Sequence, residues 1–293
     1  MTTDISIVTG WGGIYGSGHF RRMLLLAVHL TEKYRYSVEI CGKNLPVGNY
    51  TGLPVKFKND YPEKTHLIIH DRRDSTVNEI SELQRKAPVI TVDDTGEGRF
   101  TADRVLDLLP NLEFSREYNR NIFLYGYDFF ENLKKIYYEI NRDSDFLYYF
   151  TGSNDDLNRV RNLIPGKKLM ILYNSDVYEK ELCQEMKLSV NYTEALFKNE
   201  YVITHFGILP YEAILCGCRP VFINPSEYHS KLAAKEAQFR NFLQLGTYEK
   251  IRYGADEMMK NLKFDHIKQK PSEAGKQVIE NLDRFAEMLS VYL

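Results

Sequence analysis

Short apolar runs alternate with stretches of helical periodicity along the whole chain. Residues 5–8 alternate apolar and polar positions, which predicts a half-buried strand, and residues 23–30 continue as an apolar helix. Further strands are expected at 37–41, 66–70, 88–92, 104–108 and 121–125, with helices at 76–85 and 129–140. This alternation predicts a parallel sheet covered by helices.

The pattern restarts near residue 145. Strands are expected at 145–150, 168–172, 188–190, 201–203 and 220–223, with helices between them and a long terminal helix at 272–293. A chain of 293 residues has room for two such units. We therefore predict an α/β fold with two Rossmann-like domains, residues 1–143 and 144–293.

A glycine-rich turn follows the first predicted strand. Five glycines lie within nine residues, and Gly16 and Gly18 directly precede His19 and the apolar helix. Glycine lets the backbone approach a ligand, and the N–H groups of a first helical turn attract anions. Histidine is the side chain that accepts a proton near neutral pH. The sequence thus predicts an anion-binding turn with a base, His19, on its rim.

Polar residues gather where the other predicted strands end. Such ends follow the strands at 66–70, 88–92, 145–150 and 201–203. Ligands of parallel α/β sheets bind beyond the carboxyl ends of the strands. Two such sets of loops predict a ligand held in a cleft between the domains. The residues at these ends are His70, Asp71, Arg72, Asp93, Asp94, Thr151, Gly152, Ser153, Thr204, His205 and Gly207, with Glu212 in the next helix.

Composition narrows the class of protein. The net charge of −2 argues against nucleic acid as a partner, which needs a basic face. No run approaches the roughly 20 apolar residues of a membrane span, and no secretion signal is recognisable, so we expect a cytoplasmic protein. Cys41 and Cys183 are isolated and Cys216-Gly-Cys218 is not a zinc spacing. We expect no metal and no cofactor, and the oligomeric state stays open.

The motifs carry a resemblance to a known family. The segment Gly16-x-Gly18-His19-x-x-Arg22 resembles the opening motif of the UDP-sugar hydrolases of the pseudaminic-acid pathway, the PseG family. The resemblance continues in order through 92–99, 102–111, 150–155 and 201–220, and so spans most of residues 1–245. These hydrolases are relatives of the glycosyltransferase that adds N-acetylglucosamine in peptidoglycan synthesis.

The resemblance implies a GT-B fold and hydrolysis of a UDP-linked amino sugar without a metal. Two Rossmann-like domains would face each other, with UDP on the C-terminal one and the last helix crossing back to the first. By the resemblance, His19 activates water for attack at the anomeric carbon, and Glu212 binds the ribose hydroxyls. The substrate-binding residues it implies are Gly16, Gly18, Arg22, Asp93, Asp94, Thr151, Gly152, Ser153, Thr204, His205 and Gly207.

The chain departs from the family pattern at three places, one of which is Tyr228-His229-Ser230-Lys231, where the family's glutamine and asparagine are not clear. His205-Phe206-Gly207-Ile208 stands where relatives have Gly-Gly-Ser/Thr, so one glycine and a hydroxyl are lost at the expected phosphate turn. His70-Asp71-Arg72 replaces the family's Asp-x-Tyr, which predicts a changed sugar pocket.

Several readings stay open at the level of sequence. Asp93 and Asp94 could hold a metal or cap helix ends, and His70 with Asp71 could be a structural pair. Glu212 could offset a helix dipole. For function, a glycosyltransferase, in which His19 deprotonates an acceptor hydroxyl, and a non-catalytic nucleotide-sugar binding protein compete with the hydrolase.

Overall fold

The computed structural model describes residues 3–12, 18–112, 119, 121–141, 144–150, 154–164, 167, 169–173, 192–240, 242–251, 254–262 and 269–293. The chain forms two compact units. Unit 1 comprises Met1–Phe130 together with Lys276–Leu293, and unit 2 comprises Glu131–Gly275. Gly16, Thr151, Gly152, Ser153 and the strand predicted at 188–190 lie outside the described residues.

Unit 1 is built on a six-stranded parallel sheet with the strand order β3-β2-β1-β4-β5-β6. Its strands are β1 (Thr3–Thr9), β2 (Val38–Cys41), β3 (Lys56–Lys58), β4 (Thr65–Asp71), β5 (Val89–Val92) and β6 (Arg104–Leu106). Its helical segments are α1 (Gly18–Tyr34), η2 (Val47–Tyr50), α2 (Val77–Gln84) and η3 (Glu97–Phe100); α3 (Tyr127–Lys134) and α9 (Pro271–Leu289) each run across the division between the units.

The first strand is buried on both faces, so the prediction of a half-buried strand is wrong. β1 lies between β2 and β4, and helices cover both sides of this part of the sheet. The polar residue Ser6 is fully buried and donates a hydrogen bond of 2.8 Å to the buried Glu39 carboxylate. Glu39 is in turn paired with Lys58 at 3.0 Å, so the polar groups inside this face satisfy one another.

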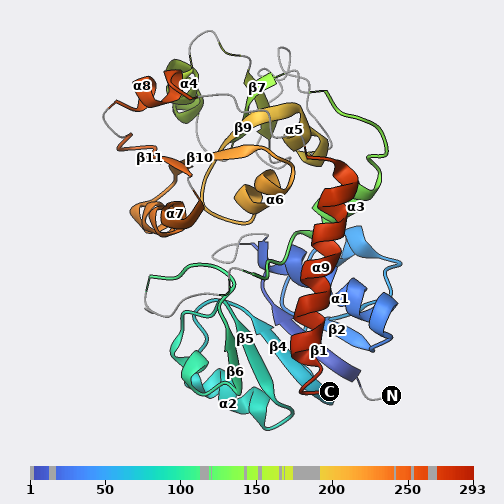
Figure 1. Cartoon of the computed structure of the whole chain (residues 1–293). Coiled ribbons are helices and arrows are strands. Elements are labelled where there is room, and N and C mark those ends of the chain that lie inside the picture. The colour runs from blue at the N-terminus through green and yellow to red at the C-terminus, as the bar shows by residue number, and fades with distance from the viewer. Residues whose placement is uncertain are drawn as a thin grey trace. The chain divides into compact units, whose positions relative to one another are not determined.

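Different helices cover the two faces of the sheet in unit 1. α2 packs on one face through Ile80 and Leu83, which share a cluster with Val8 and Ile68. On the other face α9 lies along α1, as Figure 1 shows, and Asp283 of α9 accepts hydrogen bonds from three residues of α1. These donors are His29 (2.9 Å), Lys33 (2.6 Å) and Tyr34 (3.1 Å).

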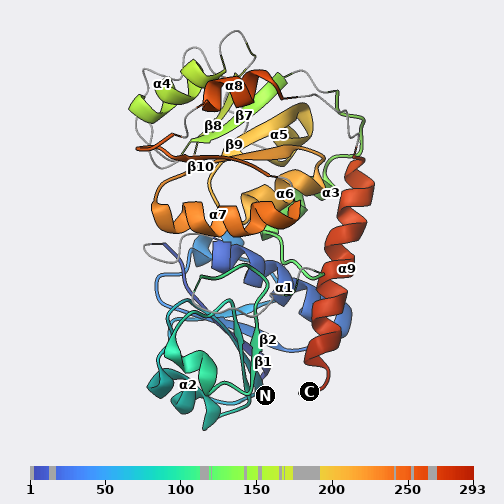
Figure 2. The ribbon, with the colours of Figure 1, turned by 60° about the vertical axis from the view of Figure 1, so that its left-hand side comes forward.

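Unit 2 is built on a five-stranded parallel sheet with the order β11-β10-β9-β7-β8. Figure 2 shows α6 and α7 on one face of this sheet and α4 and α8 on the other. The α4/α8 face holds the larger apolar cluster, which includes Leu157, Tyr148 and Ile203. The elements are β7 (Ser144–Phe150), α4 (Asn154–Leu163), β8 (Leu169–Tyr173), α5 (Tyr192–Lys198), β9 (Asn199–Thr204), α6 (Leu209–Leu215), β10 (Arg219–Asn224), α7 (Glu227–Arg240), β11 (Leu243–Thr247) and α8 (Ala255–Lys260).

The α/β class with two parallel sheets is confirmed, but not every predicted element forms. Residues 121–125 are not a strand. Side chains of α9 form hydrogen bonds with the backbone of this segment instead. Asn281 accepts from the Phe123 N–H at 2.8 Å, and Arg284 donates to the Asn121 carbonyl at 3.1 Å. A backbone whose polar groups are satisfied in this way does not need a ladder partner.

Candidate functional site

A histidine and an aspartate meet at the carboxyl end of the sheet in unit 1. β4 pairs with β1 in parallel, so that Thr9 and Asp71 lie side by side at the strand ends. His19 is in the first turn of α1, which follows β1. Its Nδ1 atom lies 2.8 Å from Oδ1 of Asp71, 52 positions away in the sequence. The His19 side chain is 13% exposed and Asp71 is fully buried, so the pair sits at the edge of the interior.

Arg22 fixes this pair one turn further along α1. Its Nε donates to Asp71 Oδ2 at 2.9 Å and its Nη2 donates to Asp71 Oδ1 at 2.5 Å, which is a bidentate ion pair. Its Nη1 donates to Asp93 Oδ2 at 2.6 Å. The guanidinium is buried, and the two carboxylates outweigh the effect of burial and raise its pKa. Arg22 therefore holds the ends of β4 and β5 in fixed positions.

The electrostatics assign the proton on His19. Burial opposes ionisation of Asp71, but Arg22 and His19 together lower its pKa to about 2. An ionised carboxylate only accepts hydrogen bonds, so Nδ1 of His19 carries the proton that Asp71 binds. Arg22 Nη2 also lies 3.4 Å from this Nδ1. An Nδ1 that carries a proton cannot accept from Arg22, so the shorter contact with Asp71 is the hydrogen bond that His19 makes. With the proton of Nδ1 held by Asp71, the neutral form of this imidazole has its lone pair on Nε2, which is the arrangement that a general base requires.

The adjacent Asp93 and Asp94 point to different partners. Asp93 adopts a left-handed backbone conformation with φ 49°. Its Oδ1 accepts from the N–H groups of Leu108 (2.7 Å) and Leu109 (2.8 Å), and its Oδ2 accepts from Arg22. Burial raises the pKa of Asp93 despite the arginine.

Asp94 holds the loop before α2. Its carboxylate accepts from the N–H of Ser75 at 3.1 Å, from the Ser75 hydroxyl and from the N–H of Gly96 at 2.9 Å. A Cβ atom at Gly96 would collide with the Ser75 backbone, so this approach requires glycine. The sequence left Asp94 either as a metal ligand or as a cap, and its contacts are those of a residue that caps the loop before α2. No group of metal-ligating side chains is found in the described part of the chain.

Unit 2 brings together buried polar atoms at the ends of β9 and β10. Thr204 ends β9 and Asn224 ends β10, and both are fully buried. Asn224 Oδ1 accepts from the Phe206 N–H at 2.9 Å. Among the described residues, Thr204 Oγ1, Asn224 Nδ2 and His205 Nδ1 are buried and have no hydrogen-bond partner. Buried polar atoms are ordinarily paired, so these three atoms are candidates for contact with a polar ligand.

Aromatic rings surround His205. The ring centroid of His205 is 6.0 Å from that of Tyr149 at the end of β7 and 6.4 Å from that of His229. His229 in turn lies 2.8 Å from the Ser226 hydroxyl through its Nδ1. Burial, with a smaller effect of His229, lowers the pKa of His205 to about 4, so this imidazole is neutral at physiological pH. A neutral imidazole gives a ligand one donor and one acceptor without a charge.

The other predicted residues of unit 2 lie on the segment that follows. At Gly207 an added Cβ would meet nothing within 4 Å, so open space borders the chain there. Glu212 is in α6 and only 3% exposed. The sequence predicted His19, Arg22, Asp93, Thr204 and His205 as site residues, but it did not predict that Asp71 contacts His19. The signal for Asp71 was its position directly after a buried strand that neighbours the first one.

Known structures share the fold at very low sequence identity. The spinosyn forosaminyltransferase SpnP superposes with a TM-score of 0.60 at 12% identity, over 99% of both chains. UGT89C1 of Arabidopsis thaliana, complexed with UDP, gives 0.56 at 8% identity, over 98% of this chain and 99% of that one. A putative UDP-N-acetylglucosamine 2-epimerase from Listeria monocytogenes gives 0.54 at 10% identity, over 100% and 97%.

These likenesses confirm the GT-B type of fold, which was expected from the resemblance. They include transferases and an epimerase, so the fold alone does not fix the reaction. No protein-family model and no curated protein matches the chain. Within the part of the chain that the structure describes, no helix has the length and apolar composition that crossing a bilayer requires.

Proposed function

We propose that this protein transfers a glycosyl group from a nucleotide-activated sugar to an acceptor hydroxyl, with His19 as the general base. The observation that carries the proposal is the pair of His19 and Asp71 at 2.8 Å, held by Arg22 at the carboxyl end of a GT-B type sheet. A histidine with a fixed tautomer and a buried, ionised partner is typical of a side chain that accepts a proton during a reaction.

The reaction follows from this arrangement. The acceptor O–H gives its proton to Nε2 of His19 while the oxygen attacks the anomeric carbon. The bond from that carbon to the phosphate oxygen breaks, and the nucleoside diphosphate leaves with the electron pair. Asp71 stays ionised and stabilises the imidazolium, because its pKa of about 2 is too low for it to take the proton.

The nucleotide end of the donor is assigned to unit 2. The unpartnered atoms of Thr204, Asn224 and His205 lie where parallel sheets bind ligands. The fold relative UGT89C1 was solved with UDP, and VinC, another relative, was solved with dTDP. We therefore assign a nucleoside diphosphate to this edge, with Glu212 on the ribose as the family resemblance implies.

A second candidate is hydrolysis of a UDP-linked amino sugar. The segment Gly16-x-Gly18-His19 favours it, since it resembles the hydrolases of the pseudaminic-acid pathway. In that case water takes the place of the acceptor hydroxyl and His19 keeps its role.

The nucleophile is tested by measuring UDP release from UDP-N-acetylglucosamine and other UDP-linked amino sugars, with and without a panel of hydroxyl acceptors. We expect release that depends on the acceptor. Release of UDP and free sugar without acceptor would replace the transferase by the hydrolase. Tight binding of the donor with no turnover under any condition would contradict both and leave a binding protein.

A further inference from the structure

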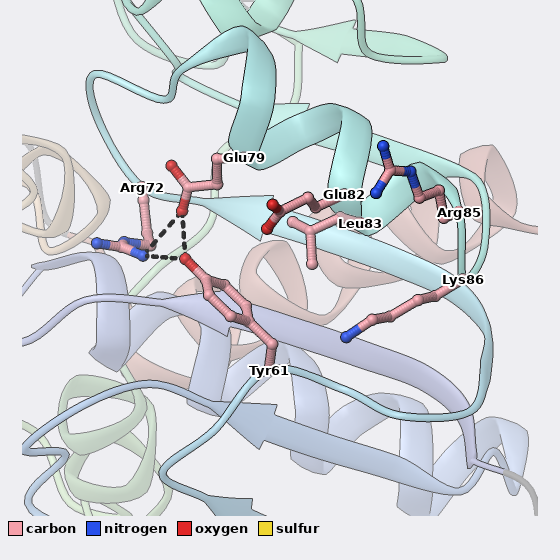
Figure 3. A pocket seen from close by; sticks show the side chains of 7 residues that line it. All are labelled: Tyr61, Arg72, Glu79, Glu82, Leu83, Arg85 and Lys86. Atoms are coloured by element: carbon pink, nitrogen blue, oxygen red, sulfur yellow. Dashed lines mark hydrogen bonds and ion pairs between the residues drawn. The ribbon is translucent and has the colours of Figure 1, made fainter.

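A pocket of about 550 Å³ lies in unit 1, on the α2 side of the sheet. Its volume is within the range of about 300–1,000 Å³ that is usual for small-molecule sites. Figure 3 shows the side chains around it, which come from α2 and the residues just after it, from the residue after β4, and from the segment before β4. They are Tyr61, Arg72, Glu79, Glu82, Leu83, Arg85 and Lys86.

The pocket is separate from the pair of His19 and Asp71. Successive side chains of a strand point to opposite faces of its sheet. Asp71 at the end of β4 faces Arg22 of α1, whereas His70 before it and Arg72 after it both reach Glu79 of α2. The pocket and the catalytic pair therefore share the end of one strand but lie on its two faces.

The tyrosine of the pocket is held in place from two sides. The Tyr61 hydroxyl donates to Glu79 Oε1 at 2.6 Å, and Arg72 Nη1 donates to the same oxygen at 3.0 Å. Lys86 at the end of α2 donates to the carbonyl of Pro62 at 2.7 Å and so fixes the segment that carries the ring. The Tyr61 residue is nevertheless 42% exposed, so an ordered aromatic ring is presented in the pocket.

Both donors and an acceptor surround this ring. Glu79 is engaged by Tyr61, Arg72 and His70, of which His70 contributes most to lowering its pKa, to about 2. Glu82, Arg85 and Lys86 are all exposed. The charge of Glu79 is balanced by Arg72. Of the three exposed residues, Arg85 and Lys86 are cations and Glu82 is a carboxylate, so the pocket carries one excess positive charge.

We propose that this pocket binds a saccharide that carries an anionic group. An aromatic ring packs against the apolar C–H face of a pyranose, and sugar hydroxyls both donate and accept, which suits a rim of arginine, lysine and glutamate. The excess positive charge of Arg85 and Lys86 selects a carboxylate or phosphate on the sugar. This site does not depend on the proposed transfer reaction.

Binding is measured by saturation-transfer NMR and calorimetry on the full chain, with glucuronate, glucose 6-phosphate, glucose and acetate as probes. We expect glucuronate or glucose 6-phosphate to bind about tenfold more tightly than glucose, which corresponds to one charge-assisted contact, and acetate to bind more weakly than the charged sugars. The stronger of the two charged sugars identifies the anionic group. We expect saturating UDP to leave the affinity for the charged sugar unchanged. Displacement of the sugar by UDP would overturn the proposal.

Variants locate the site. The double change Arg85→Gln and Lys86→Gln lowers the affinity for the charged sugar about tenfold, to that of glucose. The charge-matched double control Lys43→Gln and Lys56→Gln, at two exposed positions outside the pocket, leaves it unchanged. Tyr61→Phe keeps the ring and keeps binding, and Tyr61→Ala loses it. Equal affinity in the wild type, the double variant and Tyr61→Ala, or no difference between charged and neutral sugars, would contradict the proposal.

Discussion

At the scale of single residues, the proposed function depends most on which nitrogen of His19 carries a proton. Asp71 accepts from Nδ1 at 2.8 Å, and this contact leaves the lone pair on Nε2, the atom that we propose takes the proton of the acceptor. The pair is connected through Arg22 to Asp93, so three charged residues from α1, β4 and the end of β5 hold one base. The same residues are buried, and for that reason their substitution affects stability as well as activity.

His19→Asn tests the base directly. A positioned general base contributes roughly 10²–10⁴-fold to turnover, so we expect the rate of UDP release to fall by about that factor. Binding of UDP measured by calorimetry stays near the wild-type value, because loss of a base acts on the transition state. His66→Asn, at a 60% exposed histidine of β4, is the matched control and leaves the rate unchanged. Wild-type turnover in a folded His19→Asn protein would rule out this role.

Asp71→Asn tests the link between the buried charge and stability. Removing one member of a buried ion pair costs about 3–5 kcal/mol, and we expect a loss of this order in urea unfolding at pH 7. The half-exposed Asp128→Asn, which faces Arg21 at 3.3 Å, serves as control and costs about 1 kcal/mol or less.

The difference in stability between the wild type and Asp71→Asn should depend on pH. The pKa of Asp71 is lowered from 3.8 to about 2 on folding, so its contribution is complete above pH 4 and is lost as the pH falls toward 2. The difference between wild type and Asp71→Asn should therefore shrink by about 2 kcal/mol over this window. Burial and the charge of Asp71 both raise the pKa of Asp93, so this pKa is lower in Asp71→Asn, and Asp93 offsets part of the decrease in the difference. A difference that stays constant from pH 5 to pH 2 would show that Asp71 is not held ionised.

Glu212 is tested through the nucleotide. Hydrogen bonds to a charged group contribute about 1.5–3 kcal/mol, so Glu212→Gln should weaken UDP binding by roughly tenfold to a few hundredfold. Glutamine is used because the residue is only 3% exposed and glutamine preserves its volume. The preference for UDP over its 2′-deoxy analogue should be smaller in the variant. Unchanged UDP affinity by calorimetry would leave Glu212 with a purely structural role.

At the scale of the elements, α9 stabilises unit 1 through one apolar stripe and one carboxylate. Val278, Leu282, Phe285 and Leu289 are nearly or fully buried, and Asp283 receives the three donors of α1. The spacing of these apolar residues is that of a helix with one buried face.

Phe285→Ala should therefore cost about 3–5 kcal/mol, since it leaves a cavity behind a fully buried ring. Thermal and urea unfolding measure the loss, with Val291→Ala, at a 79% exposed position, as the control that changes little. An unfolding transition of Phe285→Ala that coincides with that of the control would show that α9 does not stabilise unit 1.

The elements also show what the sequence could and could not predict. Long apolar runs such as 66–70 and 88–92 were predicted as strands, and they form β4 and β5. The strand β3 was missed because it is three residues long, with two exposed lysines at the edge of the sheet. The burial of Ser6 depends on Glu39, a partner 33 positions away, which no local pattern shows. Likewise, Asp71 joins His19 only because β4 is placed beside β1.

At the scale of the whole molecule, the fold provides two parallel sheets, and the proposed reaction uses side chains at the ends of their strands. Transferases and an epimerase share this fold at 8–12% identity. The loops and strand ends, rather than the sheets, thus distinguish one reaction from another.

Turnover of the whole enzyme should not require a divalent cation. The Asp93 and Asp94 carboxylates, which were considered as metal ligands, accept hydrogen bonds from Arg22 and from the loop at Ser75 and Gly96. Excess EDTA should therefore leave UDP release unchanged, with a magnesium-dependent enzyme assayed in the same buffer as the positive control. Activity that disappears with EDTA and returns with Mg²⁺ would assign these carboxylates to a metal-bridged diphosphate.

The alternation of His70 and Asp71 at the end of β4 with Arg72 directly after it has a consequence for how this protein can change over evolution. A substitution at one of these positions alters one face of the sheet, but the gain or loss of a single residue in β4 exchanges the faces of every residue on one side of the change. Asp71 would then turn away from His19 at the same moment that Arg72 left Glu79. We therefore expect descendants of this sequence to keep both Asp71 and the length of β4, and to accept point mutations more readily on the Glu79 face.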